Sequence, residues 1–244
     1  MSDNRLSLHL GKTESILFGS KRRLRHSNEF NVTINNQVIE RKESVKYLGL
    51  NLTSDLSWTG LVGDIAKKAN SRLKFLYRYR NCLNQKTRRI VVFALIQYLF
   101  EYASGAWFCS ISKTDVKKLE IIQNKMVRFV NDLDSRTHIG INELQEAGLL
   151  DVTQRAKQLV LHHVHKIYYS NVDHYLTENF SRVSNIHGYN TRQSQLNFVL
   201  PKRTGQIGNS FYFNGTTFWN SLPSYVKSVR NFHHFKIVLK RYLK

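Results

Sequence analysis

The sequence predicts an α+β fold that is mostly helical, with a small antiparallel sheet, a helical bundle and a small basic C-terminal module. Three observations lead to this prediction. Segments before residue 58 alternate apolar and polar residues, apolar residues recur at helical spacing from residue 59, and proline is absent before Pro201. With 244 residues, 41% hydrophobic and 22% charged, the chain can bury a sizeable core.

The N-terminal part carries the strand signals. Residues 30–34 (FNVTI) alternate with a period of two, Asn35 and Asn36 tolerate positive φ, and residues 37–39 (QVI) return as the second arm of a hairpin. Residues 45–52 are a further strand candidate, and residues 15–18 (SILF) form a short apolar run. These segments predict one antiparallel sheet of three or four strands within residues 1–58.

Residues 59–175 are predicted to be helical. In the first helix the apolar residues Ile65, Ala69, Leu73 and Leu76 share one face, and Lys67, Lys74 and Arg78 fall within about 40° of each other on the opposite face. The next helix, residues 86–108, is apolar all round and is expected at the centre of the core. A third helix begins near Ser112 and runs to Leu133, and a fourth begins at Asp151 and runs to about Tyr169.

Residues 176–244 differ in kind from the helical part. Both prolines and eight of the aromatic residues, between Tyr189 and Tyr225, fall here. This composition favours short strands and turns, followed by one amphipathic helix from about Asn231 to Leu243. We place a soft boundary near residues 170–185, which gives three predicted parts: 1–58, 59–175 and 176–244.

The charge distribution indicates a polyanionic partner. The formal net charge is +20, every acid lies at or before Glu178, and residues 179–244 carry ten Lys/Arg and no acid. A second acid-free stretch, residues 65–100, holds nine bases: Lys67, Lys68, Arg72, Lys74, Arg78, Arg80, Lys86, Arg88 and Arg89. Nucleic acid is the favoured partner, while ribosomal, membrane-surface or incidental charge remain alternatives.

Several other classes of protein find no support. Two cysteines exclude a disulfide framework and a Cys-rich zinc module. The N-terminus has no signal-peptide pattern, and the longest nearly apolar run, residues 90–100, is shorter than a membrane span needs. We therefore expect an intracellular protein, cytoplasmic or nuclear, without a membrane partner.

No catalytic or metal site is predicted from the residues. His162, His163 and His165 with His174 form the only histidine cluster, and His163 falls on the apolar face of its helix as a core histidine. Asp132 and Asp134, the only closely spaced acids of the required kind, are expected at a solvated helix end. No P-loop, G-x-S-x-G or G-x-G-x-x-G motif occurs, so no metal or cofactor is expected for this chain.

Aromatic and basic residues are interleaved in a way that suits single strands or hybrid duplexes, because bases stack on aromatic faces while cations neutralise phosphates. Residues 74–80 (KFLYRYR) are the clearest example, and about half of the aromatics must nevertheless serve the core. The predicted nucleic-acid-binding residues are Lys67, Lys74, Arg78, Arg80, Lys86, Arg88, Arg89, Tyr189, Arg192, Lys202 and Arg203.

Several segments together resemble the reverse transcriptases of jockey-like non-LTR retrotransposons (LINE-type transposable elements). They occur in the family's order and cover nearly the whole chain: residues 12–19 (KTESILFG), 45–52 (VKYLGLNL), 56–58 (LSW), 101–102 (EY) with Trp107, 119–125 (LEIIQNK), 189–192 (YNTR) and 218–223 (FWNSLP).

The resemblance implies that residues 1–58 are the remnant of an RNA-directed DNA polymerase palm and that the helices beyond form a thumb. Tyr47, Leu48 and Gly49 match a strand that acts as a primer grip, and Lys12 matches a lysine that assists the leaving pyrophosphate in the intact polymerase. The implied partners are RNA, RNA/DNA hybrid or DNA, and the palm and fingers portion that this chain lacks.

The chain departs from the family at the catalytic centre. The family's aspartates lie in an earlier palm strand and in an aromatic-Ala-Asp-Asp turn, whereas no Asp-Asp pair occurs here and only eleven residues precede Lys12. Mg²⁺ therefore belongs to the intact polymerase and not to this chain. We expect a C-terminal fragment that binds template-primer and is not an enzyme alone. A non-catalytic host protein that binds RNA or DNA, and a small enzyme of another class, are the alternatives.

Overall fold

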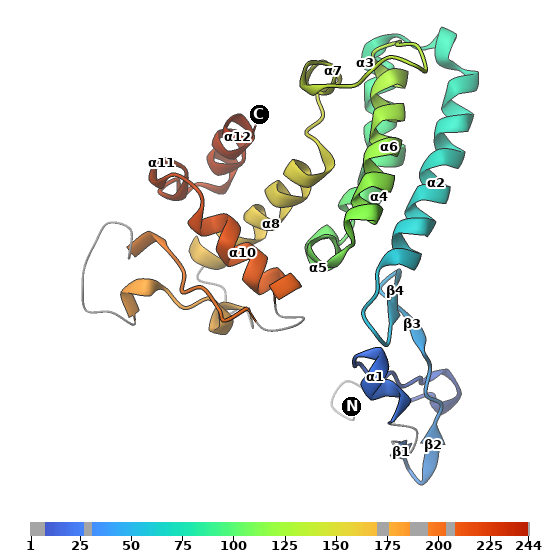
Figure 1. Cartoon of the computed structure of the whole chain (residues 1–244), viewed down its shortest axis with the longest axis vertical. Coiled ribbons are helices and arrows are strands. Elements are labelled where there is room, and N and C mark those ends of the chain that lie inside the picture. The colour runs from blue at the N-terminus through green and yellow to red at the C-terminus, as the bar shows by residue number, and fades with distance from the viewer. Residues whose placement is uncertain (1–7, 27–30, 170–175, 186–194, 204–207, 244) are drawn as a thin grey trace. The chain divides into compact units, whose positions relative to one another are not determined.

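The structure is a computed structural model that describes residues 8–26, 31–169, 176–185, 195–203 and 208–243. The fold is α+β and mostly helical, as the sequence predicts. The chain divides into two compact units, Met1–Asp64 and Ile65–Lys244 (Figure 1). The division after Asp64 lies close to the predicted boundary after residue 58. The predicted boundary after residue 175 falls inside the second unit.

The first unit contains two separate β-hairpins. Strands β1 (Val32–Ile34) and β2 (Gln37–Ile39) pair antiparallel, and the positive φ angles of Asn35 and Asn36, 49° and 61°, close the predicted turn. Strands β3 (Ser44–Tyr47) and β4 (Leu50–Thr53) form the second hairpin. The prediction of one sheet with three or four strands is therefore wrong, because residues 45–52 contain a turn rather than one strand.

Two short helical elements complete this unit. The 3-10 turn η2 (Leu10–Lys12) precedes Ser15, which forms an isolated parallel bridge with Arg41. Helix α1 (Lys21–Arg25) begins at Ser20, whose hydroxyl accepts a hydrogen bond from the Arg23 amide. Residues 15–18, the predicted apolar run, form no named strand.

Helix α2 (Thr59–Arg78) confirms the predicted helical periodicity. Ile65, Ala69, Leu73 and Leu76 are all buried, so they form the core-facing side of the helix. The 3-10 turn η3 (Arg80–Cys82) follows directly. Asn84 then caps the next helix by accepting a hydrogen bond from the Thr87 amide at 2.8 Å.

The predicted continuous helix over residues 86–108 is interrupted. It consists of α3 (Gln85–Val92), the π-helical segment η4 (Phe93–Gln97), α4 (Tyr98–Glu101), α5 (Ser104–Trp107) and the 3-10 turn η5 (Phe108–Ser110). Ala103, with a φ of 49°, separates α4 from α5. The expectation that this segment is buried on all sides is wrong, because Ile90, Leu95 and Tyr98 are exposed while Val92, Ile96, Phe100 and Trp107 are buried.

By length and composition alone, residues 85–110 could cross a membrane, and they are the one stretch in the described chain that passes this test. About a third of the apolar part of this stretch is buried inside the structure. Core helices of soluble proteins pass the same test, so the absence of a membrane partner stays a prediction.

Helix α6 (Lys113–Val130) begins where the sequence predicts. The hydroxyl of Ser112 accepts a hydrogen bond from the Asp115 amide at 3.1 Å and donates one to the Asp115 carboxylate at 2.8 Å. Helix α7 (Ile141–Ala147) follows, and α8 (Val152–Tyr169) begins at the predicted cap, because Asp151 accepts a hydrogen bond from the Gln154 amide at 2.8 Å.

The C-terminal residues are more helical than predicted. They form η6 (Thr177–Asn179), η7 (Val183–Asn185), α10 (Phe211–Asn220), α11 (Ser224–Lys227) and α12 (Phe232–Tyr242). Helix α12 confirms the predicted terminal amphipathic helix. The expected strands are wrong for the part described, where the bridge between Arg182 and Phe198 is the remaining β pairing.

The C-terminal helices share a hydrophobic core with α8. Val164 and Tyr168 from α8 lie in one buried cluster with Trp219 of α10 and Phe235 and Leu239 of α12. The Tyr168 and Trp219 rings stack with centroids 5.0 Å apart. Most aromatic side chains of this region therefore stabilise the fold rather than face a ligand.

Candidate nucleic-acid interface

The outer face of α2 carries the predicted row of cations. Lys67, Lys74 and Arg78 are exposed, on the side of the helix opposite its buried residues. Within the described chain none of the three is within salt-bridge distance of a carboxylate. Since an α-helix rises 1.5 Å per residue, Lys74 and Arg78 lie about 6 Å apart along the axis and Lys67 about 10 Å before Lys74. We call these three residues the cation row.

Two aromatic side chains lie next to the cation row. Phe75 and Tyr79, one helical turn apart, are 53% and 50% exposed, although both are large and apolar. Their ring centroids are 5.2 Å apart and the planes are tilted by 55°. Lys68, which is also exposed, lies on the same side of the helix. We call Phe75 and Tyr79 the aromatic pair.

Contacts with neighbouring helices fix the rotation of α2 about its axis. The Tyr77 hydroxyl donates to the Lys125 carbonyl of α6 at 3.3 Å, and the Tyr77 ring meets the edge of Phe129 at 5.2 Å. On the other side the Arg72 guanidinium donates to the Tyr98 hydroxyl at 2.7 Å and to the Leu95 carbonyl. Figure 1 shows α2 running alongside α6. Because both flanks are held, the cation row is directed away from the bundle.

Arg80 and Arg88, two of the predicted nucleic-acid-binding residues, are held by contacts within the protein, and their assignment to nucleic-acid binding stays a prediction. The Arg80 Nε atom is 2.5 Å and the Arg88 Nη1 atom 3.0 Å from the Asp132 carboxylate. Arg88 is buried and also donates to the Leu83 carbonyl at 2.9 Å, and Arg80 donates to the Leu133 carbonyl at 3.1 Å. The two guanidinium groups therefore tie the α2–α3 connection to the end of α6.

Asp132 likewise has a role that the sequence did not indicate. Its side chain is 59% exposed just after α6, as expected of a solvated helix end, and its carboxylate also pairs with the two arginines while its backbone adopts a φ of 60°. The hydrogen bond from Arg88 and the positive charge of both arginines lower the pKa of Asp132. Asp134 is exposed, and its carboxylate accepts a hydrogen bond from the Arg136 amide at 2.8 Å.

The remaining predicted cations differ in their surroundings. Lys86 is exposed, whereas the Arg89 guanidinium lies against Gly148 and 5.9 Å from the centre of the Phe93 ring. Lys202 and Arg203 are exposed, and the Arg203 guanidinium is 5.8 Å from the centre of the Phe213 ring. Tyr189 and Arg192 lie outside the described residues.

The residues expected to form a primer grip lie at a turn in the first unit. Tyr47 ends β3, and Leu48 and Gly49 connect it to β4 with φ angles of 46° and 83°. The predicted strand is therefore wrong for Leu48 and Gly49, which form a turn, whereas Tyr47 lies in a strand, and the primer-grip role of the three residues stays a prediction. Tyr47 and Leu48 are 62% and 73% exposed, and Lys12 is exposed at the end of η2.

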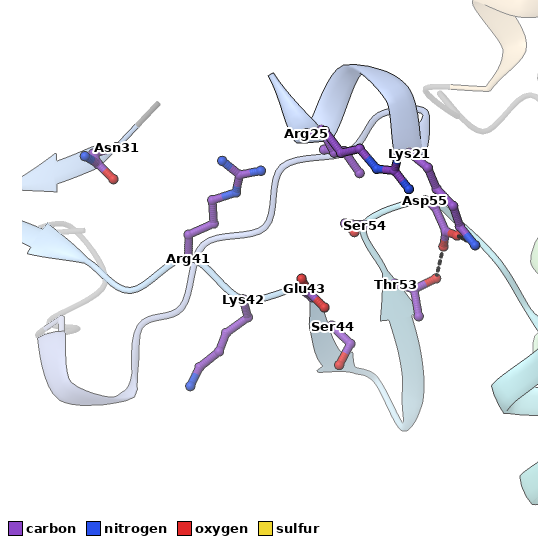
Figure 2. A pocket seen from close by; sticks show the side chains of 11 residues that line it. Lys21, Arg25, Asn31, Arg41, Lys42, Glu43, Ser44, Thr53, Ser54 and Asp55 are labelled. Carbon is purple, nitrogen blue, oxygen red and sulfur yellow. Dashed lines mark hydrogen bonds and ion pairs between the residues drawn. The ribbon is translucent and has the colours of Figure 1, made fainter. Parts of the chain in front are cut away.

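A hollow of about 900 Å³ opens beside α1 and the second hairpin of the first unit (Figure 2). Its charged lining consists of Lys21, Arg25, Arg41, Lys42, Glu43 and Asp55. Lys21 Nζ is 3.5 Å from the Asp55 carboxylate, and Lys42 Nζ is 2.7 Å from that of the adjacent Glu40. Because two of the four cations already face carboxylates, this hollow is a weaker anion site than α2.

The histidines of α8 are arranged differently from the prediction. His163 is exposed rather than a core residue, and the buried histidine is His165, whose Nε2 atom lies 2.7 Å from the Val229 carbonyl. The helix phase was misjudged, because the buried face follows Ala156, Val160 and Val164. In the described chain no group of three His, Cys, Asp or Glu side chains could hold a metal ion.

No family model matches the chain, and the search of curated proteins and that of solved structures found no similar protein. The resemblance to jockey-like polymerases therefore rests on the sequence segments alone. The geometry of α2 is an independent observation, since it depends on where this chain buries and exposes its own side chains.

Proposed function

We propose that the chain binds nucleic acid through the outer face of α2, as the C-terminal, non-catalytic part of a jockey-like non-LTR reverse transcriptase that holds template-primer RNA or RNA/DNA hybrid. The observation that carries the proposal is the cation row, three exposed cations on one helix face, none of which is within salt-bridge distance of a carboxylate in the described chain. The order of the family-like sequence segments supports the assignment to this class of polymerase.

Electrostatics favours a polyanion over a small acidic ligand. A solvated helix face normally mixes both signs, because opposite charges three or four residues apart stabilise a helix and like charges do not. The face of α2 instead gathers like charges along the direction of the axis. A strand of phosphates can contact all of them at once and release its condensed counterions, which provides the driving force for binding.

The test replaces Lys67, Lys74 and Arg78 together by alanine. If each contacts one phosphate, the slope of log K against log salt falls in magnitude by roughly 0.7–0.9 per residue, or about 2–3 for the three. The measurement is a salt titration of binding to single-stranded RNA and to an RNA/DNA hybrid. Folding stability should change little, because exposed charge substitutions usually stay within about 0.5 kcal/mol each.

The matched control is the double variant K117A/K118A on α6. Lys118 Nζ lies 2.9 Å from the Asp115 carboxylate, so its charge is already compensated within the protein. We expect a much smaller change of the salt slope for this variant. An unaltered slope in the triple variant, with the fold intact by circular dichroism, would refute the proposed interface.

A further inference from the structure

We infer that the aromatic pair, Phe75 and Tyr79, makes the α2 face a site for unpaired bases, so that this face binds the single-stranded part of a template-primer, RNA or DNA, more tightly than an intact duplex. The inference rests on the proposed function, because it assigns the ligand class of that same face. It is carried by two exposed rings beside a row of uncompensated cations.

The pair is among several exposed aromatic side chains of the molecule, whereas other large aromatic side chains, including Trp107, Phe129, Trp219 and Phe235, are buried in the core. On α2 the buried side is instead filled by aliphatic residues, and the rings of the aromatic pair remain about half open to solvent. The Phe75–Tyr79 contact is the one ring contact found for either residue in the described chain. The pair is therefore not needed to fill the core.

The positions on the helix bring the rings and the cations within reach of one ligand. At 100° per residue, Phe75 is about 60° from Arg78 and about 100° from Lys74 around the axis, and Tyr79 is about 100° from Arg78 and about 140° from Lys74. Lys68 lies about 20° from Phe75 on this projection, about two turns earlier. A strand whose phosphates follow the cation row can thus place its bases over the aromatic pair.

The chemistry of stacking selects unpaired bases. Inside a duplex each base is covered on both faces by its neighbours and offers only its edges in the grooves, so a side-chain ring cannot stack on it. An unpaired base exposes its face, and stacking on an aromatic side chain contributes severalfold to more than a hundredfold in affinity per base. Every base has such a face, so we expect little dependence on base sequence.

The test compares the wild-type chain with the double variant F75L/Y79L, which keeps apolar side chains but removes the rings. The probes are a fluorescently labelled single-stranded RNA of about 12 nucleotides, within the size range of known single-strand sites, and a blunt RNA/DNA hybrid of the same length. We expect the double variant to bind the single strand at least about tenfold more weakly and the hybrid within about twofold of wild type. The salt slope should be unchanged, because no charge is removed.

A control and three contrary outcomes complete the test. Tyr225, which is 60% exposed on α11, provides the matched variant Y225L, and its binding should equal wild type. Equal losses of affinity for both probes, or no loss of affinity for the single strand, would overturn the inference. The proposed function would still be decided separately by the salt slope of the cation-row variant. Absence of binding to both probes by the wild type at low salt would overturn both.

Discussion

Acidification should weaken the C-terminal core through His162, a half-buried side chain of α8. Its Nε2 atom is buried and has no hydrogen-bond partner within the part of the chain described, and its ring meets those of Phe232 and Phe235 edge-on at 5.7 and 6.4 Å. Burial is the largest cause that lowers the pKa of His162, and together with the positive charges of Arg155 and Lys236 and the neighbouring His163 and His165 it brings this pKa to about 4.

The direction of the effect follows from proton linkage. An unfolded histidine has a pKa of about 6.5 and the folded one about 4, so between these values the unfolded chain binds more protons. The contribution of His162 to the free energy of unfolding is complete above about pH 6.5. This contribution is lost as the pH falls toward about 4, and it does not change further below about pH 4. A difference of about 2.5 pKa units corresponds to about 3 kcal/mol at most, at 1.36 kcal/mol per unit.

Other titrating groups can be separated from His162. Burial also lowers the pKa of His165, which adds a loss in the same direction. Asp55, Asp132 and Glu143 have lowered pKa values as well, but carboxylates of this kind lose their stabilisation only below their unfolded pKa of about 4. The window from pH 6.5 to 4 therefore reports mainly on the histidines.

The assay is urea unfolding of the full chain, followed by circular dichroism at half-unit steps from pH 7 to 4. The variant His162→Leu removes the titrating ring and keeps an apolar side chain. Between pH 7 and pH 4 the free energy of unfolding should therefore decrease less in this variant than in wild type, and the difference should be up to about 3 kcal/mol. The control is His233→Leu, the same replacement at an exposed position of α12, and it should follow wild type. An identical pH dependence for His162→Leu and wild type would refute the reasoning.

Three further predictions concern the backbone and the chemistry. Gly148→Ala should lower the free energy of unfolding by about 1–2 kcal/mol, because Gly148 has a φ of 76° and a new Cβ would lie 1.8 Å from the Arg89 Nη2 atom. Gly63→Ala inside α2, where a Cβ meets nothing within 4 Å, should raise it by up to about 1 kcal/mol in the same denaturation experiment. The purified chain with a primed RNA template, deoxynucleotides and Mg²⁺ should show no primer extension above background, since it has no Asp-Asp pair; template-dependent extension would contradict this.

The sequence predicted those parts of the fold that depend on local periodicity and capping. The buried face of α2, the start of α6 at Ser112, the start of α8 at Asp151 and the Asn35–Asn36 turn all follow from neighbours within four residues. Local rules fail where a turn uses an unusual residue. Leu48 takes a left-handed conformation that favours Gly or Asn, so the β3–β4 hairpin looked like one strand.

The candidate site could be predicted only where it depends on one helix. The exposure of Lys67, Lys74 and Arg78 follows from the phase of α2. The pairing of Arg80 and Arg88 with Asp132 joins residues more than 40 positions apart, and no periodic signal encodes it. His165 was missed for a related reason: its burial is decided by contacts with Phe235 and Val229, which belong to the far end of the chain.

In the acid-free stretch 65–100 the arginines and the lysines differ in their surroundings. This difference indicates which of its positive charges can contact a ligand. Four of its five arginines contact other parts of the protein: Arg72 binds the Tyr98 hydroxyl, Arg80 and Arg88 bind Asp132, and Arg89 lies against Gly148. Its four lysines, Lys67, Lys68, Lys74 and Lys86, are all exposed.

The physical chemistry of the two cations explains the division. A guanidinium group has five donors in a planar fork and is weakly hydrated, so it suits buried carbonyls and carboxylates, whereas an ammonium group is a strongly hydrated point charge. Of the nine bases, the four lysines, Arg78 and Arg89 are exposed and are what this stretch can offer to phosphates. An interface dominated by lysine positions a phosphate chain but does not read base edges. We therefore expect the affinity to depend on the salt concentration and on stacking over Phe75 and Tyr79, and not on base sequence.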